Sequence, residues 1–536
     1  MSVVPSNSTE SVRNQPGGCD FLKRLADYKS EPPMMSKRIN RFLALLFVLA
    51  LGMATLLVKH DASVSAQRAN VAGSNARNAA IVTTTAEVLK ETSEIRELTI
   101  LRPVRSGAQS RSEIERMLIK NLNDQMTPAE MHATEVSLRK FGLAPADFDY
   151  RSFMIKLLTE QVAGYYDAKA QEFHLADWLE LEGQKPVMAH ELTHALQDQH
   201  FNLRRFEKWP HGDSDGELAA HALIEGDATL AMMVYMAKNP LVALAFSRSL
   251  TTGVSTEQYD QAPRAMRESL IFPYLQGSEW ATQLYRKGGW TMVSNAFTRL
   301  PLSSEQILHP EKYFTYERPI KIVLPDVTNL LNARSQQTAN SKQQTADIQR
   351  SEVRSKRSAG TAGVSPASTR ARISRDGTSR SPQPTAAWRR IESDVNGEWT
   401  YYLILDEFLK SPAESKRAAA GWAGDRYALY EGPNGQVLLS QLTAWDTESD
   451  AREFFDAYVK RTELRYPGAK RIDSAGSQQE TRNPKLEASL SYSWQTSEGK
   501  VFIELRGLRV AILEGVPEGV EPSSVMGSFG TTVRLP

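Results

Sequence analysis

The chain has 536 residues, with 64 Lys and Arg against 63 Asp and Glu, and hence a net charge of +1. This length exceeds one ordinary domain, and the balanced charge provides no overall field that would attract nucleic acid. Hydrophobic residues make up 41% and charged residues 24%, which argues against wholesale disorder and against many membrane spans. The single cysteine, Cys19, excludes a disulfide framework and a cysteine-built zinc site.

The first pronounced feature is an uncharged apolar run at residues 42–58, preceded by basic residues within 37–41. Its length is near the lower limit for a bilayer span, about 17 residues, and exceeds the usual apolar core of a signal peptide. Residues 1–66 are therefore predicted to contain either a signal anchor or a signal peptide cleaved after Ala66. The basic flank predicts that the rest of the chain is extracytoplasmic, membrane-anchored if the run is retained and secreted or periplasmic if it is cleaved.

Residues 80–332 are expected to form the first folded domain, because they mix helical and strand patterns with good apolar content. Within them, Thr127-Pro128-Ala129-Glu130 has the N-cap, proline and capping glutamate of a helix start. The stretch 164–175 has the pattern of a β-hairpin, with turn-forming residues at 167–170.

Composition changes at residues 335–386, which are rich in Ser, Gln and Arg and contain no aromatic residue. Such a segment buries too little apolar surface to order itself, so it is predicted to be a disordered insertion. Its basic residues lack the interleaved aromatics of a nucleic-acid-binding segment, which favours a solvated linker. Residues 388–536 are predicted to form a small α+β domain, with a helix at 450–458 and two strands on either side of Gly507.

The residues that carry chemistry are concentrated in one predicted helix, which is expected to begin near Pro186. His190 and His194 are four residues apart, so both imidazoles lie on one helix face and can bind one ion. Glu191 follows the first histidine, where its carboxylate can act as the general base of metal-assisted hydrolysis. His200 lies on another face and is excluded from that ion. The alternative, two histidines on an ordinary amphipathic helix, is disfavoured because the full H-E-x-x-H pattern is rare by chance.

A catalytic zinc site needs a third protein ligand, and the best candidate is Glu225 in a second predicted helix. A carboxylate in so apolar a helix is costly to bury unless it is paired or metal-bound. His221 is the rival ligand, and either His221 or Glu217 could instead orient the ligands. Asp227 is set aside because it points away from Glu225 around the helix. The predicted cofactor is one Zn²⁺ held by the two histidines and this glutamate.

The motif HELTHALQDQH at 190–200, followed by ALIEGDAT at 222–229, resembles the gluzincin branch of the zincin metallopeptidases. More closely, the chain is similar to a group of bacterial metallopeptidases that share three further motifs, AGYYD at 163–167, PYLQG at 273–277 and SEQILHP at 304–310. The resemblance covers about residues 150–320 and the motif GWAGDRY at 421–427. It implies an α+β, zincin-like metallopeptidase domain with a helix-borne HExxH and a second helix that supplies a glutamate.

The resemblance also implies further roles. In the gluzincins the strand before the zinc helix is an edge strand that pairs with an extended peptide, and residues 171–175 occupy that place. Tyr274 and His309 lie in matching motifs and are catalytic candidates that would stabilise the developing oxyanion, although each residue type is also common in purely structural positions. The chain departs from the best-known gluzincins at Ala228 and Thr229, where those enzymes carry an aspartate that holds a histidine.

The sequence therefore predicts a membrane-tethered or exported zinc metallopeptidase that acts on a peptide or protein substrate and does not bind nucleic acid. Residues 42–58 would contact the membrane if they are retained. The main alternative is a catalytically silent zinc-binding interaction protein whose C-terminal domain binds a partner. A third alternative is a zinc hydrolase that acts on a non-peptide amide. The intact triplet of His190, Glu191 and His194 favours an active enzyme.

Overall fold

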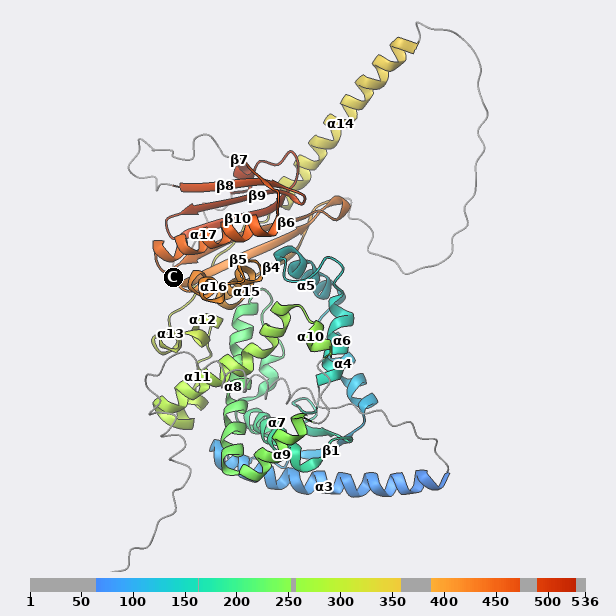
Figure 1. Ribbon diagram of the computed structural model, residues 1–536, viewed down its shortest axis with the longest axis vertical. Coiled ribbons are helices and arrows are strands. Elements are labelled where there is room, and N and C mark those ends of the chain that lie inside the picture. Colours follow the sequence, from blue (N-terminus) through green and yellow to red (C-terminus); the bar gives the residue numbers. More distant parts are fainter. Residues whose placement is uncertain (1–63, 162, 252–256, 358–386, 473–488, 527–536) are drawn as a thin grey trace, which may run out of the picture.

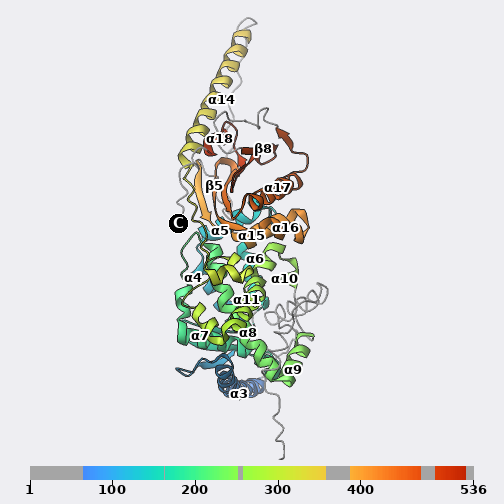
Figure 2. The same ribbon diagram turned by 90° about the vertical axis from the view of Figure 1, so that its left-hand side faces the viewer.

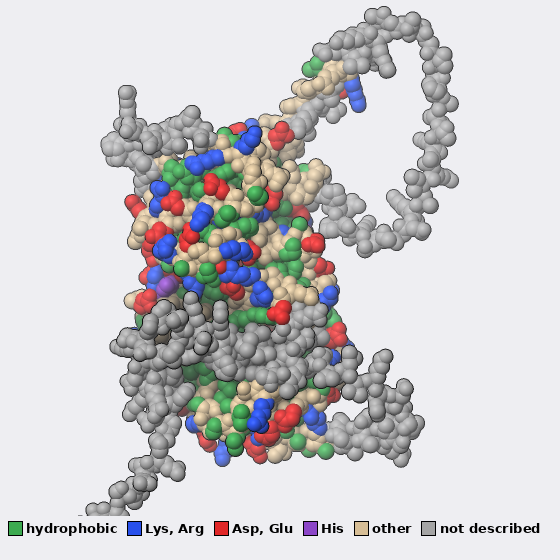
Figure 3. Space-filling view, in the orientation of Figure 1, with side chains coloured by type: hydrophobic (Ala, Val, Ile, Leu, Met, Phe, Trp, Pro, Cys, Tyr) green, Lys and Arg blue, Asp and Glu red, His purple; other side chains and the backbone are tan. Residues whose placement is uncertain are grey.

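The computed structural model describes residues 64–161, 163–251, 257–357, 387–472 and 489–526. A helical N-terminal region lies at one end, and a seven-stranded antiparallel sheet with its own helices lies at the other (Figure 1; Figure 2). This arrangement confirms the predicted mixture of helices and sheet. On the described surface of the face in Figure 3, Lys and Arg are interspersed with Asp and Glu over the C-terminal region.

The predicted apolar run 42–58 lies outside the described residues. In the described part of the chain, no single helix combines the length and apolarity of a membrane span. One bent pair, α8 (Ser214–Lys238) with α9 (Pro240–Thr251), meets both criteria when the two helices are taken together.

The N-terminal region consists of helices around a small sheet. The remaining helices are α3 (Val64–Arg96), α4 (Arg111–Gln125), α5 (Pro128–Phe141), α6 (Tyr150–Gln161), α7 (Leu181–Phe201), the 3₁₀ helix η1 (Leu203–Phe206), α10 (Glu257–Gln261), α11 (Arg264–Ala296), α12 (Ser304–Leu308) and α13 (Pro310–Thr315). The strands are β1 (Arg105–Gln109), β2 (Gly164–Asp167) and β3 (Glu172–Ala176).

Helix starts follow the capping chemistry of the sequence. Helix α5 begins where predicted, because Thr127 and Glu130 form a reciprocal capping box. Helix α7 begins earlier than predicted, at Leu181, because the Glu180 side chain accepts hydrogen bonds from the first backbone N–H groups of the helix. Pro186 therefore lies inside α7 and not at its start.

The small sheet has the strand order β1-β3-β2. Strands β2 and β3 form the predicted antiparallel hairpin, in which Tyr166 lies opposite Phe173. Strand β1 pairs in parallel with the other side of β3. The prediction that residues 171–175 form an edge strand is therefore wrong, because β3 lies between β1 and β2. Strand β1 was not expected from the sequence, since it has little apolar character. Among the described residues, no strand pairs with the outer side of β2, so β2 is the edge strand of the hairpin.

The C-terminal region is built on a sheet of order β4-β5-β6-β10-β9-β8-β7. Its strands are β4 (Arg389–Asp394), β5 (Trp422–Glu431), β6 (Val437–Trp445), β7 (Lys470–Ile472), β8 (Ser489–Thr496), β9 (Gly499–Arg506) and β10 (Arg509–Val516). Its helices are α15 (Gly397–Leu409), α16 (Pro412–Ala419), the 3₁₀ helix η2 (Pro433–Gly435), α17 (Glu448–Arg465) and α18 (Pro522–Met526). Strands β9 and β10 are the predicted pair around Gly507, and α17 contains the predicted helix 450–458.

Both faces of the large sheet are covered. Along β5, Leu429 belongs to a core shared with α15 and α17, whereas its neighbour Tyr430 belongs to a second core formed with residues 320–331 and α18. The first core continues into the N-terminal region, where the rings of Phe272 and Trp399 lie 4.7 Å apart. The two regions therefore share a continuous hydrophobic core.

The segment predicted to be a disordered insertion is helical at its start. Helix α14 (Thr328–Arg357) contains residues 335–357, so the prediction of disorder is wrong there, and residues 358–386 lie outside the described part of the chain. Leu331 in the first turn is fully buried and anchors the helix, which then projects from the body (Figure 1). Composition measures the capacity to form a core, whereas Ala, Gln, Lys and Arg also have a high intrinsic helix propensity.

The chain segments that flank this insertion are joined directly. The Asn332 side chain accepts a hydrogen bond from Trp388 N–H at 2.8 Å and donates one to Trp388 O at 3.1 Å. The Trp388 indole N–H donates to Ser335 Oγ at 3.0 Å, and Leu331 packs in the same cluster as this indole. The fold is therefore continuous from the start of α14 to β4.

We predict that replacing residues 340–385 by a short Gly/Ser linker leaves the melting temperature and metal content nearly unchanged. Closing a long flexible loop changes the free energy by only about 0.6 kcal/mol per doubling of length. Differential scanning fluorimetry and metal analysis of the purified protein provide the measurement. Loss of folding on deletion would contradict the prediction, whereas Asn332→Ala should lower the melting temperature in either background.

A buried ion cluster ties α5 to the C-terminal sheet. Arg461 and Arg465 of α17 bind the two oxygens of the Glu514 carboxylate at 2.7 and 2.9 Å, and both Arg461 and Glu514 are fully buried. Arg461 also donates to Phe141 O, the last residue of α5, at 2.6 Å. Burial alone would raise the pKa of Glu514, but the two guanidinium groups outweigh it and lower this pKa to about 2.

Glu514→Gln is predicted to destabilise the fold by about 3 kcal/mol at neutral pH. Because the folded-state pKa of Glu514 is depressed, its stabilisation is present above the unfolded-state pKa, about 4.3, and is lost as the pH falls toward 2. The gap in melting temperature between wild type and variant should therefore narrow between about pH 5 and pH 3. The control is Glu453→Gln, which removes an exposed ion pair between Glu453 of α17 and Arg417 of α16. A gap that is independent of pH would contradict the assignment.

Candidate metal centre

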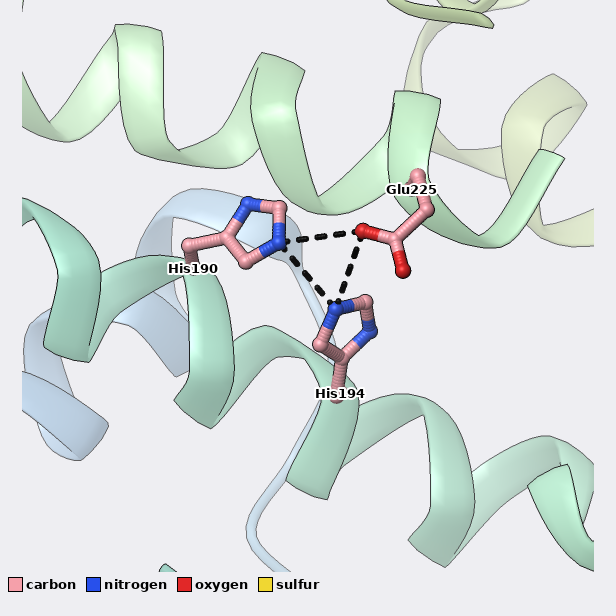
Figure 4. Close-up of side chains that lie close together, drawn as sticks. All are labelled: His190, His194 and Glu225. Carbon is pink, nitrogen blue, oxygen red and sulfur yellow. Dashed lines mark hydrogen bonds and ion pairs between the residues drawn. The ribbon is translucent and has the colours of Figure 1, made fainter. Parts of the chain in front are cut away.

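Two packed helices bring the predicted ligands together. His190 and His194 project from α7 and Glu225 projects from α8, all toward one point (Figure 4). His190 Nε2 lies 3.2 Å from His194 Nε2 and 3.1 Å from Glu225 Oε2, and His194 Nε2 lies 3.4 Å from the same oxygen. Both histidines are buried, whereas the Glu225 side chain is 23% exposed. Three donor atoms thus converge at a position that solvent can reach from one side.

The spacing of these donors fits a bound transition-metal ion. Imidazole nitrogen and carboxylate oxygen bind zinc at about 2.0–2.2 Å, and two ligands of a tetrahedral ion at that distance lie about 3.3 Å apart. The observed separations of 3.1–3.4 Å agree with that value. The group can therefore hold one metal ion and leave a fourth position for water or substrate.

The charges of the three groups are strongly coupled. Burial alone would raise the pKa of Glu225, but the adjoining His194 and His190 outweigh burial and hold this pKa well below its ordinary value. Burial also opposes a charge on His194, but the Glu225 carboxylate outweighs it and raises the pKa of His194 to about 9. The Glu225 carboxylate and the His194 imidazole thus favour each other's charged forms, and binding of a metal ion to them would release a proton.

Glu191 lies beside the three donors. Burial raises its pKa, while the nearby His190 and His194 oppose the rise. The backbone N–H of Tyr166 in β2 donates to Glu191 Oε2 at 3.0 Å and holds the carboxylate in place. Because this N–H points toward Glu191 and not toward β3, the carboxylate lies at the free edge of β2. A held carboxylate with a raised pKa is suited to accept a proton and return it.

Helices α8 and α11 approach each other closely because two glycines meet at their contact. A Cβ atom on Gly226 would lie 2.2 Å from the backbone of Gly277, and a Cβ on Gly277 would lie 2.2 Å from Ala222 O. Any side chain at either position would therefore push the helices apart. Gly226 directly follows Glu225 in α8, and Gly277 is the last residue of the PYLQG motif in α11. The motif therefore has a packing role.

This close approach brings Tyr274 of α11 to the metal-binding cluster. Its ring centroid lies 6.0 Å from that of His190. Burial, followed by the charges of Glu225 and Glu191, raises the pKa of Tyr274 well above its ordinary value. The hydroxyl group therefore keeps its proton at neutral pH and can act as a hydrogen-bond donor. The sequence-based candidate Tyr274 thus lies at the site.

The other predicted residues lie elsewhere. His309 stands between α12 and α13, where its Nε2 is 3.0 Å from Glu398 Oε1 of α15 and this bond raises the pKa of His309. This contact joins the two regions of the protein, and the catalytic role of His309 stays a prediction. His221 is exposed, and His200 Nε2 lies 2.8 Å from Thr99 O, so neither joins the three donors.

Gln197 is a site residue that sequence reasoning missed. Its Oε1 lies 2.9 Å from His194 Nδ1, the ring nitrogen that faces away from Glu225. Gln197 thus holds one of the two histidines through a hydrogen bond. An aspartate at the position of Ala228 or Thr229 would have been expected to hold a histidine from the resemblance to the gluzincins. The spacing of Gln197, three residues after His194 on the same helix, was the available signal.

Comparison with known proteins concerns only the C-terminal region. A family model described as a domain of unknown function (DUF8575) matches residues 384–525, which include the seven-stranded sheet. No curated protein and no solved structure matches the chain.

Glu225→Ala is predicted to weaken zinc binding by more than about 100-fold, beyond the 10–100-fold loss typical of an outer partner. The reason is that it removes one of three donors. Competition with a chromophoric chelator measures the affinity. Glu217→Ala and His221→Ala are the matched controls, because both lie on α8 outside the donor cluster. A larger loss in His221→Ala than in Glu225→Ala would reverse the ligand assignment.

Proposed function

We propose that the protein is a zinc-dependent metallopeptidase of the zincin-like class. The observation that supports this proposal is the convergence of His190, His194 and Glu225, with the Glu191 carboxylate beside them. Two imidazoles and one carboxylate are the donor set of zinc hydrolases with an open fourth position. The HExxH helix α7, the glutamate helix α8 and the preceding hairpin support the zincin-like assignment.

Each residue at the site has a role in peptide hydrolysis. When bound, the ion supplies Lewis-acid polarisation of the substrate carbonyl and acidifies water. Glu191 accepts the proton of the attacking water and returns it to the leaving amine. The Tyr274 hydroxyl donates a hydrogen bond to the oxygen of the scissile carbonyl as negative charge develops there. The His190 and His194 side chains keep their Nε2 atoms directed at the ion.

The position of β2 supports an extended peptide as substrate. The edge of β2 opposite β3 pairs with no strand in the described part of the chain. The Tyr166 N–H on that edge donates a hydrogen bond to Glu191. A peptide that adds to this edge as a further strand would pass directly by the general base. This role falls to β2, since β3 is covered on both sides.

The apolar run 42–58 and its basic flank support a location outside the cytoplasm, at the membrane or released from it. The mixed surface charge and the net charge of +1 support a protein substrate and not nucleic acid.

Glu191→Gln is predicted to retain zinc while losing peptide hydrolysis by about 10²–10⁴-fold, because the amide cannot accept the proton. Cleavage of a diverse peptide mixture, with sequencing of the products, measures the activity, and chelator should abolish it in wild type. The control is Glu182→Gln, an exposed carboxylate in the first turn of α7. Equal cleavage by wild type and Glu191→Gln would contradict the mechanism.

The second candidate function is a catalytically silent zinc-binding interaction protein. It is favoured by a cavity of about 1120 Å³ between α5 and the turns of the large sheet, with His132, Lys140, Glu431 and Glu498 in its lining. Glu431 and Glu498 of this lining lie within residues 384–525, the range that the family model matches, whereas His132 and Lys140 lie outside it. Zinc content without chelator-sensitive cleavage of any peptide would favour this function over the peptidase.

A further inference from the structure

A chain of buried polar contacts extends from the metal centre to helix α3. His194 Nδ1 lies 2.9 Å from Gln197 Oε1, and Gln197 Nε2 donates to Asp227 Oδ2 at 2.9 Å. Arg96, the last residue of α3, donates through Nε to Asp227 Oδ1 at 2.5 Å. Gln197, Asp227 and Arg96 are all fully buried. The contacts thus connect three helices, α7, α8 and α3.

The partners of Gln197 determine the orientation of its amide. Its nitrogen faces Ile224 O at 3.0 Å as well as the Asp227 carboxylate, and both of these groups can only accept hydrogen bonds. The NH₂ group must therefore point toward them, which leaves Oε1 toward His194. An oxygen at this place requires the proton of the imidazole to reside on Nδ1. The Nε2 lone pair is then free for the ion.

We propose that Gln197, Asp227 and Arg96 act together as positioning residues that fix the tautomer and ring orientation of His194 for metal binding. This inference rests on the proposed metal centre. It assigns a role to Asp227, which helical spacing alone excludes as a ligand. It also gives the buried ion pair of Arg96 and Asp227 a role at the metal centre.

Asp227→Asn gives the most informative break in this chain. An asparagine that accepts from Arg96 presents its NH₂ group to the NH₂ group of Gln197, so that two donors face each other. If the Gln197 amide turns over to relieve this conflict, it gives up its hydrogen bond to Ile224 O and its NH₂ group faces His194 Nδ1. The imidazole proton must then move to Nε2, the atom that should bind the ion. The same type of substitution inverts the tautomer of the catalytic histidine in serine proteases.

A second substitution should repair the first. In Asp227→Asn/Arg96→Met, the asparagine can turn its oxygen toward Gln197 because no cation occupies the other side. The methionine replaces the guanidinium group, whose Cζ lies 4.7 Å from the centre of the Trp290 ring, with a thioether suited to the same contact. The Gln197 amide then returns to the orientation that favours metal binding by His194.

The test is the affinity of the purified full chain for Zn²⁺ by chelator competition, together with the visible spectrum of the Co²⁺-loaded protein. Asp227→Asn should weaken Zn²⁺ binding by about 10–100-fold, and the double variant should return to within about threefold of wild type. Gln197→Leu should weaken binding to the same extent as Asp227→Asn. Glu514→Gln controls for loss of stability alone, since it breaks a buried ion cluster in the C-terminal region.

The possible outcomes separate the inference from the proposed function. Recovery of Zn²⁺ affinity in Asp227→Asn/Arg96→Met supports the inference. Two substitutions that only damaged the fold would together weaken binding more than Asp227→Asn alone. Unchanged affinity in both Asp227→Asn and Gln197→Leu, or a double variant as weak as Asp227→Asn, overturns it while leaving the metal centre intact. A wild-type chain that binds no ion overturns the metal centre and this inference together.

Discussion

The constraint on which the structure depends is the burial of three polar donors where α7 and α8 pack together. Two imidazoles and a carboxylate in an apolar setting are costly to desolvate unless they bind one another or a cation. His190, His194 and Glu225 meet this requirement by converging within 3.1–3.4 Å. Both histidines are buried there, whereas the Glu225 side chain remains 23% exposed, so solvent can reach the cluster beside Glu225.

The surrounding elements serve this arrangement through backbone packing. Gly226 and Gly277 allow α11 to approach α8 so closely that Tyr274 reaches the donor cluster. The hairpin of β2 and β3 brings a backbone N–H to Glu191. The C-terminal sheet does not contribute to the cluster, but it shares a continuous core with α11 and is locked to α5 by the buried Glu514 ion cluster. The region matched by the family model is thus packed against the helices that carry the site.

Sequence periodicity predicted the ligand cluster because the spacing of residues along a helix determines the direction in which their side chains point. His190, His194 and Glu225 follow from that rule and from the cost of burying a carboxylate. Contacts between distant segments have no such rule, which is why the ion pair of Asp227 with Arg96 and the pairing of β1 with β3 were not predicted. The start of α7 and the helical part of residues 335–386 were missed because local capping and intrinsic propensity act independently of apolar pattern.

The most direct test of the central claim is X-ray absorption spectroscopy of the zinc-loaded full chain. One tightly bound zinc with two imidazole nitrogens, and with oxygen as its other ligands at about 2.0–2.2 Å, is the result that the His190, His194 and Glu225 cluster predicts. The imidazole scattering should fall by half in His194→Ala. Zinc bound only by oxygen, or an imidazole signal that persists unchanged in this variant, would contradict the account.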